Sequence, residues 1–192
     1  MRALALAIFV VVAMADTASA HSVYGITGFA GGLLHPLVVP AHILAVSALA
    51  LLIGQQRWPY SVPAAYVVFV LAGLGAIALA YVPAAAELSL LGLAALAGVL
   101  LALARPIPVV LGVAIAAAVG LAQALDSPPE AISLTDANLA LAGTAMGSMA
   151  LLIVLTWLAS RLRREWQRIG LRIVGSWMAA SAILVLVLRI AP

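Results

Sequence analysis

The chain has 192 residues, of which 67% are hydrophobic and only 8% are charged, whereas about a quarter of the residues in an average soluble domain are charged. So few charges cannot cover a water-facing surface, which excludes a soluble protein and predicts an all-α integral membrane protein. Cysteine is absent and all nine cations are arginine. This excludes disulfides and thiolate metal sites and argues against a basic nucleic-acid face.

The N-terminal segment is typical of an export signal. A short positive start, an apolar stretch and the small-residue end DTASA predict a cleavable signal peptide over residues 1–20, cut between Ala20 and His21. The alternative is an uncleaved first helix, against which Asp16 and the shortness of the apolar run argue. After cleavage, His21 would be the mature N-terminus, and residues 21–192 would form a single transmembrane domain in a bacterial inner membrane.

Six segments after the signal peptide have the length and apolar character of membrane spans, which need about 20 mostly apolar residues. The predicted spans are 26–54, 61–82, 87–104, 107–125, 137–159 and 169–190. The sequence therefore predicts a six-transmembrane-helix bundle. Glycine pairs with GxxxG spacing, Gly28 with Gly32 and Gly143 with Gly147, predict closely packed helices.

The charged residues predict the orientation. With His21 outside, six arginines fall on the cytoplasmic side and four acids fall in the external connections. The arginines are Arg57, Arg105, Arg161, Arg163, Arg164 and Arg168, and the acids are Glu87, Asp126, Glu130 and Asp136. By the positive-inside rule, this predicts a multi-pass protein with both termini on the periplasmic side. Arg189, near the C-terminus, is the one exception. Thr135 and Asp136 predict a helix N-cap region.

The stretch GLLHPLVVPAHIL, from Gly32 to Leu44, combines two histidines with two prolines. On an unbroken helix His35 and His42 would lie ~10.5 Å apart, too far to bind one ion with metal–nitrogen bonds of about 2 Å. Pro36 and Pro40 predict a break in the first helix, which is the usual architecture of a transport site. Each histidine could simply bond a neighbouring carbonyl, but two of them around two prolines favour a functional site.

The segment from Gly28 to Gln55 resembles the first membrane segment of the HupE/UreJ family, small nickel/cobalt permeases associated with hydrogenase and urease maturation. That segment reads approximately G-F-x-x-G-x-x-H-P-x-x-G-x-D-H and ends in a G-Q-like turn. The last predicted span also resembles the family's final helix. The residues that match are Gly28, Phe29, Gly32, His35, Pro36, His42, Gly54, Gln55, Arg168, Gly170 and Gly175.

The departures from the family pattern fall on metal-directed positions. Val39 and Ala41 replace the family's glycine and aspartate before the second histidine. The family's second signature, H-G-H-A-H-G-x-E-x-P, is matched best by VGLAQALDSP, where all three histidines are replaced. Gln123 stands at one of those histidine positions and Asp126 at the acidic one. The resemblance thus implies a reduced metal site of His35, His42, Asp126 and Gln123.

His21 is a further candidate ligand. A free amino group and an imidazole on one residue form a bidentate donor pair, which would suit copper as well as nickel. The alternative is an ordinary surface residue exposed by cleavage.

We therefore predict a secondary permease for a divalent transition-metal cation, nickel or cobalt by resemblance, with no permanently bound cofactor. No nucleotide-binding loop, serine nucleophile or paired carboxylates support an enzyme. The driving force stays open between the cation gradient, the membrane potential and proton exchange. A homo-oligomer, or a partnership with metalloenzyme maturation proteins, also stays open. The alternatives are a non-transporting scaffold or accessory subunit, and copper handling through His21.

Overall fold

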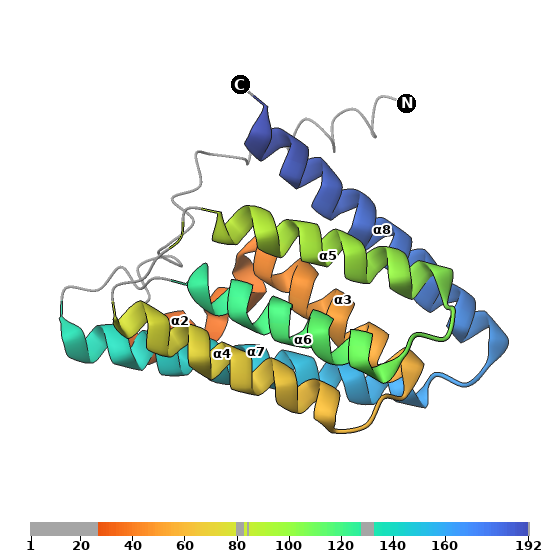
Figure 1. Ribbon diagram of the computed structural model, residues 1–192, viewed down its shortest axis with the longest axis horizontal. Helices are drawn as coiled ribbons and strands as arrows, with labels where there is room; N and C mark the ends of the chain where they lie inside the picture. Colours follow the sequence, from red (N-terminus) through yellow and green to blue (C-terminus); the bar gives the residue numbers. More distant parts are fainter. Residues whose placement is uncertain (1–26, 80–82, 84, 128–132, 192) are drawn as a thin grey trace.

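The computed structural model describes residues 27–79, 83, 85–127 and 133–191, and every regular element among them is an α-helix. The predicted signal peptide and His21 lie outside the described residues. The helices are α2 (Gly28–Val38), α3 (Pro40–Gln56), α4 (Ser61–Ala78), α5 (Ala86–Leu103), α6 (Val109–Leu125), α7 (Leu134–Arg161) and α8 (Glu165–Ile190) (Figure 1).

The prediction of an all-α membrane protein is confirmed, whereas the number of spans is confirmed only in part. Among the described residues, α5, α7 and α8 are long and apolar enough to cross a membrane, and α2 with α3 makes a fourth candidate as one broken span. The remaining two segments, α4 and α6, are shorter apolar helices. The 17 residues of α6 extend only about 25 Å, less than the roughly 30 Å hydrocarbon core of a bilayer.

The predicted break in the first helix is present, and the axes of α2 and α3 differ by 69°. Pro36 lies inside α2, Val39 adopts an extended conformation, and α3 begins at Pro40. A proline at the start of a helix costs no hydrogen bond, because the backbone N–H of a residue there would have no partner within the helix. Pro40 thus permits a second helix in a new direction.

The two glycine pairs lie against each other where α2 crosses α7. A Cβ on Gly32 would lie 1.9 Å from the carbonyl oxygen of Ala140, and one on Gly143 would lie 2.2 Å from that of Phe29. The backbones therefore approach more closely than any residue with a side chain permits. The predicted close packing is confirmed and places α2 firmly on α7.

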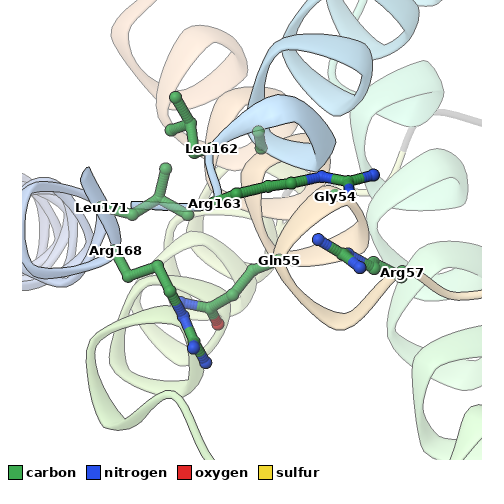
Figure 2. A pocket seen from close by; sticks show the side chains of 8 residues that line it. Gly54, Gln55, Arg57, Leu162, Arg163, Arg168 and Leu171 are labelled. Atoms are coloured by element: carbon green, nitrogen blue, oxygen red, sulfur yellow. The ribbon is translucent and has the colours of Figure 1, made fainter. Parts of the chain in front are cut away.

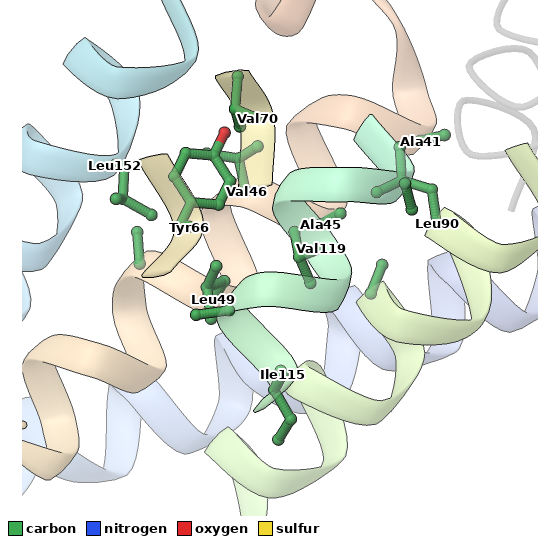
Figure 3. Packing of buried hydrophobic residues seen from close by; sticks show 14 of the residues in the cluster. Ala41, Ala45, Val46, Leu49, Tyr66, Val70, Leu90, Ile115, Val119 and Leu152 are labelled. Carbon is green, nitrogen blue, oxygen red and sulfur yellow. The ribbon is translucent and has the colours of Figure 1, made fainter. Parts of the chain in front are cut away.

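Helix α3 is the centre of the bundle. Every residue from Ala45 to Gly54 is buried, and α3 packs against α5, α6 and α7 as well as α2. Figure 3 shows part of this core, in which Val46 and Leu49 of α3 lie near Tyr66 of α4 and Val119 of α6. The candidate site at the start of α3 is therefore attached to the best-packed part of the molecule.

Most arginines lie at one end of the bundle and most acids at the other, the exceptions being Glu165 at the arginine end and Arg189 at the acidic end. The connections α3–α4, α5–α6 and α7–α8, which carry the predicted cytoplasmic arginines, share one end in Figure 1. Glu87 and Asp126 are at the other end, where Glu87 Oε1 pairs with Arg189 Nη2 at 3.0 Å. The exceptional arginine thus has an acidic partner. The segregation fits the predicted orientation, although which end faces the cytoplasm stays a prediction.

Helix α7 begins at Leu134, earlier than predicted, because Ser133 is its N-cap. The backbone N–H of Asp136 donates to Ser133 Oγ at 3.1 Å, and Ser133 Oγ donates to Asp136 Oδ2 at 2.8 Å. The N-cap is therefore Ser133, and Thr135 and Asp136, which were predicted as the cap region, lie in the first turn of the helix.

Replacing Ser133 with alanine should destabilise the protein by about 1 kcal/mol, since the N–H of Asp136 loses its acceptor. Thermal unfolding of the purified protein in detergent measures the change. Ser133→Asn, which keeps a capping oxygen, should unfold close to the parent temperature. An alanine variant as stable as the parent would show that the cap contributes nothing.

Candidate metal centre

The helix break brings the two histidines into contact. The ring centroids of His35 and His42 are 4.8 Å apart, and the ring planes meet at 87° in an edge-to-face arrangement. A straight helix would have separated these residues by ~10.5 Å. The predicted helix break is therefore what brings the histidines together, because the bend at Val39 places the turn of α2 that carries His35 next to the first turn of α3.

Asp126 joins this pair from a distant part of the chain. Its Oδ2 lies 3.0 Å from His42 Nε2, across a separation of 84 residues. Asp126 is the C-cap of α6, so the end of that helix fixes its position. The side chain of His42 is 0% exposed and that of Asp126 is 19% exposed. Asp126 is thus the accessible member and His42 the inner one.

The hydrogen bond to Asp126 constrains what His42 can bind. A neutral imidazole that donates through Nε2 carries its lone pair on Nδ1. His42 Nδ1 is buried and has no hydrogen-bond partner among the described residues. A carboxylate behind a histidine is the usual means of orienting a metal ligand and increasing its basicity. In this arrangement Nδ1 is the atom available to bind a ligand, and Asp126 positions the ring.

Gln123 is engaged with other side chains of the bundle. Its Oε1 accepts a hydrogen bond from the Tyr66 hydroxyl, and its Nε2 donates to Ser148 Oγ. Ser148 Oγ in turn donates to the carbonyl oxygen of Thr144 at 2.6 Å. The amide thus cross-links α4, α6 and α7 at a position that is only 1% exposed. Both ends of the Gln123 amide already have protein partners.

Sequence reasoning missed Tyr66 and Ser148 as partners of Gln123. Two signals were available in the sequence. Tyr66 lies within the second predicted span instead of at a membrane interface, and Thr144 and Ser148 are four residues apart in the fifth predicted span. Neither signal identifies a partner, because the contact depends on how α4, α6 and α7 pack.

The remaining predicted ligands do not complete a coordination shell. Among the described residues, no group of three or more His, Asp or Glu side chains is arranged to hold a metal ion. Asp126 contacts His42 and His42 contacts the ring of His35, so the three form a row. One ring would have to rotate for both imidazoles to bind one ion, because an edge-to-face pair does not direct two lone pairs to one point. His21 lies outside the described residues.

The comparisons with known proteins place this chain in a family. A family model described as HupE/UreJ protein matches residues 8–185. No curated protein and no solved structure matches the chain. The matched family is linked to nickel and cobalt transport, and its members are transporters and not enzymes. The match spans nearly the whole sequence and includes the His–Pro segment, the helix break and Asp126, so the chain belongs to the HupE/UreJ family.

Proposed function

We propose that this protein is a secondary permease that carries a divalent transition-metal cation, of the nickel or cobalt class, across the cytoplasmic membrane. The observation that carries the proposal is the row Asp126–His42–His35 at the break between α2 and α3. Imidazole with some carboxylate is a donor set that suits nickel and cobalt. Broken helices with polar groups at the break are also where many transporters bind their cargo.

The exposures suggest a direction of entry. A cation would first meet Asp126 at the acidic end of the bundle, where negative side chains concentrate cations. It would then pass to the buried His42 and to His35, with His21 near the mouth. Gln123 would support the site from within α6 through its bonds to Tyr66 and Ser148. The proposal takes α4 and α6 as short spans, which gives six crossings and both termini on the periplasmic side.

One observation favours a second candidate function, a non-transporting membrane scaffold. The described residues place no three metal-directed side chains around a common point. A scaffold would need no such point, whereas a permease needs the imidazoles to rearrange around its cargo.

Uptake measurements separate the two functions. Cells that express the parent chain should accumulate nickel or cobalt faster than cells without it. His42→Ala should reduce uptake to the background, and His35→Ala should reduce it at least severalfold, because each removes an imidazole ligand. Asp126→Asn keeps a hydrogen-bonding side chain but removes the charge, so we expect an intermediate rate.

Ser47→Ala is the matched control, since Ser47 is a buried polar residue of the same helix outside the proposed site. Its uptake should equal that of the parent, and the amount of each variant in the membrane is measured alongside. Equal uptake by the parent, His35→Ala and His42→Ala at equal abundance would contradict the permease proposal and support the scaffold.

A further inference from the structure

The arginine-rich end of the bundle contains a pocket of about 400 Å³. It lies where the C-terminal ends of α3 and α7 meet the start of α8 (Figure 2). Its polar wall includes Arg57 from the end of α3, Arg163 from the α7–α8 connection and Arg168 from α8. Three parts of the chain thus each contribute one arginine to the lining of a single pocket.

No carboxylate lines the pocket, and Glu165, the acid at the start of α8, forms no ion pair among the described residues. The residues that line it include neither aspartate nor glutamate. The ion pairs among the described residues are Arg189 with Glu87 and His42 with Asp126, and both lie at the other end of the bundle. Three arginines that line one pocket, with no acid in its lining, produce a local positive potential that attracts an anion.

The chemistry of the wall identifies the kind of anion. Guanidinium groups bind phosphate through paired N–H donors, in a geometry that a carboxylate or phosphate oxygen pair fits well. The same pocket has an apolar side formed by Leu162 and Leu171. A ligand with a phosphate group and an adjoining hydrocarbon portion would satisfy both sides. Basic pockets between transmembrane helices bind anionic lipid headgroups in this way.

The wall also holds one acceptor that the protein leaves unsatisfied. Gln55 Nε2 donates to the carbonyl oxygen of Leu101 at 3.1 Å, while Gln55 Oε1 is buried and has no hydrogen-bond partner among the described residues. Buried polar atoms are nearly always bonded to protein, water or ligand. A hydroxyl donor carried on a headgroup next to the phosphate would suit this oxygen.

We propose that this pocket binds a phosphate group through Arg57, Arg163 and Arg168. The source can be the headgroup of an anionic phospholipid or soluble inorganic phosphate, and the two share the same recognition chemistry. The site is distinct from the metal centre, at the opposite end of the bundle, and does not depend on metal transport.

The test uses the full chain, purified in a neutral detergent, with the thermal unfolding midpoint as readout. One arm adds phosphatidylglycerol in mixed micelles with phosphatidylcholine, and the other adds inorganic phosphate at constant ionic strength. A shift with phosphatidylglycerol alone assigns the site to lipid, and a shift with phosphate alone assigns it to the soluble anion. No shift in either arm would overturn the proposal.

A pair of charge-matched double variants separates a built site from general attraction. Arg57→Gln with Arg168→Gln removes two lining arginines, whereas Arg105→Gln with Arg161→Gln removes two from the same end that do not line the pocket. Each lining arginine should contribute about fivefold to the apparent affinity. We therefore expect roughly a 25-fold loss in the first variant and little change in the second.

Equal losses in the two double variants would also overturn the proposal, since a diffuse charge effect would then explain the binding. If the first double variant fails to fold, Arg163→Gln alone serves instead, with Arg161→Gln as its control. The single lining variant should then lose about fivefold, and an unchanged affinity would count against the site.

Discussion

Replacing Gly32 with alanine should destabilise the protein strongly, although the change adds only one methyl group. That methyl would lie 1.9 Å from the carbonyl oxygen of Ala140 and 2.9 Å from its Cα. Both atoms belong to the backbone of α7, so no change of side-chain rotamer can relieve the clash and the two helices must separate. Overpacking costs about 1–3 kcal/mol and occasionally more, and a backbone clash should reach the upper end. Thermal unfolding of the purified protein measures it.

Gly92→Ala is the control for this experiment. A Cβ on Gly92 would meet no atom within 4 Å, and alanine in a helix interior is favoured over glycine by roughly 0.5–1 kcal/mol. The control should therefore unfold at the parent temperature or slightly above it. Gly32 also lies one turn before His35, so metal uptake should fall with stability in the Gly32 variant only. Similar midpoints for the two variants would show that α2 does not pack on α7 as described.

Replacing Gln123 with leucine should have the second large effect. The change keeps the approximate size of the side chain but removes the acceptor of the Tyr66 hydroxyl and the amide donor to Ser148. Ser148 still donates to the Thr144 carbonyl oxygen and remains beside the Tyr66 hydroxyl, whereas that buried hydroxyl loses the acceptor that Gln123 supplies. Loss of a hydrogen-bond partner by a buried polar group costs about 1–3 kcal/mol. The unfolding midpoint should fall accordingly.

A double-mutant cycle with Tyr66→Phe isolates that contribution. Removing the hydroxyl together with the amide leaves no orphaned group between α4 and α6, so the double variant should be less destabilised than the sum of the two single variants. Interacting pairs typically show couplings of about 0.5–3 kcal/mol. If the two losses simply add, the Tyr66–Gln123 contact does not contribute to stability.

Local chemistry was enough to predict the helix break but not the angle at it. Pro40 cannot continue the helix of α2, because it has no backbone N–H and its ring clashes with the preceding turn, so the break follows from sequence. The 69° bend depends on where α2 finds its partner, which is set by the fit of its glycines to α7. The contact between His35 and His42 depends on that angle, so sequence could suggest it only as a possibility.

Asp126 and Gln123, the two polar residues of α6 implied by the family resemblance, show how far sequence matching can predict side-chain contacts. Asp126 at the end of α6 meets His42, as the implied site required. Gln123, one turn earlier on the same helix, contacts Tyr66 and Ser148 instead. Positions along α6 can be matched by sequence, but the surroundings of each side chain depend on which neighbouring helix it faces.

The burial of α3 has a consequence for the assembly of the protein in the cell. In the finished bundle this helix is enclosed by α5, α6 and α7, all of which leave the ribosome after it. While the chain is being made, α3 must therefore enter the bilayer without them, so its apolar character is needed for insertion as well as for the final core. His42 opposes that early step, because an ionisable side chain is costly at membrane depth. Its carboxylate partner Asp126 lies 84 residues further along the chain, so Asp126 is not yet available to His42 when α3 leaves the ribosome.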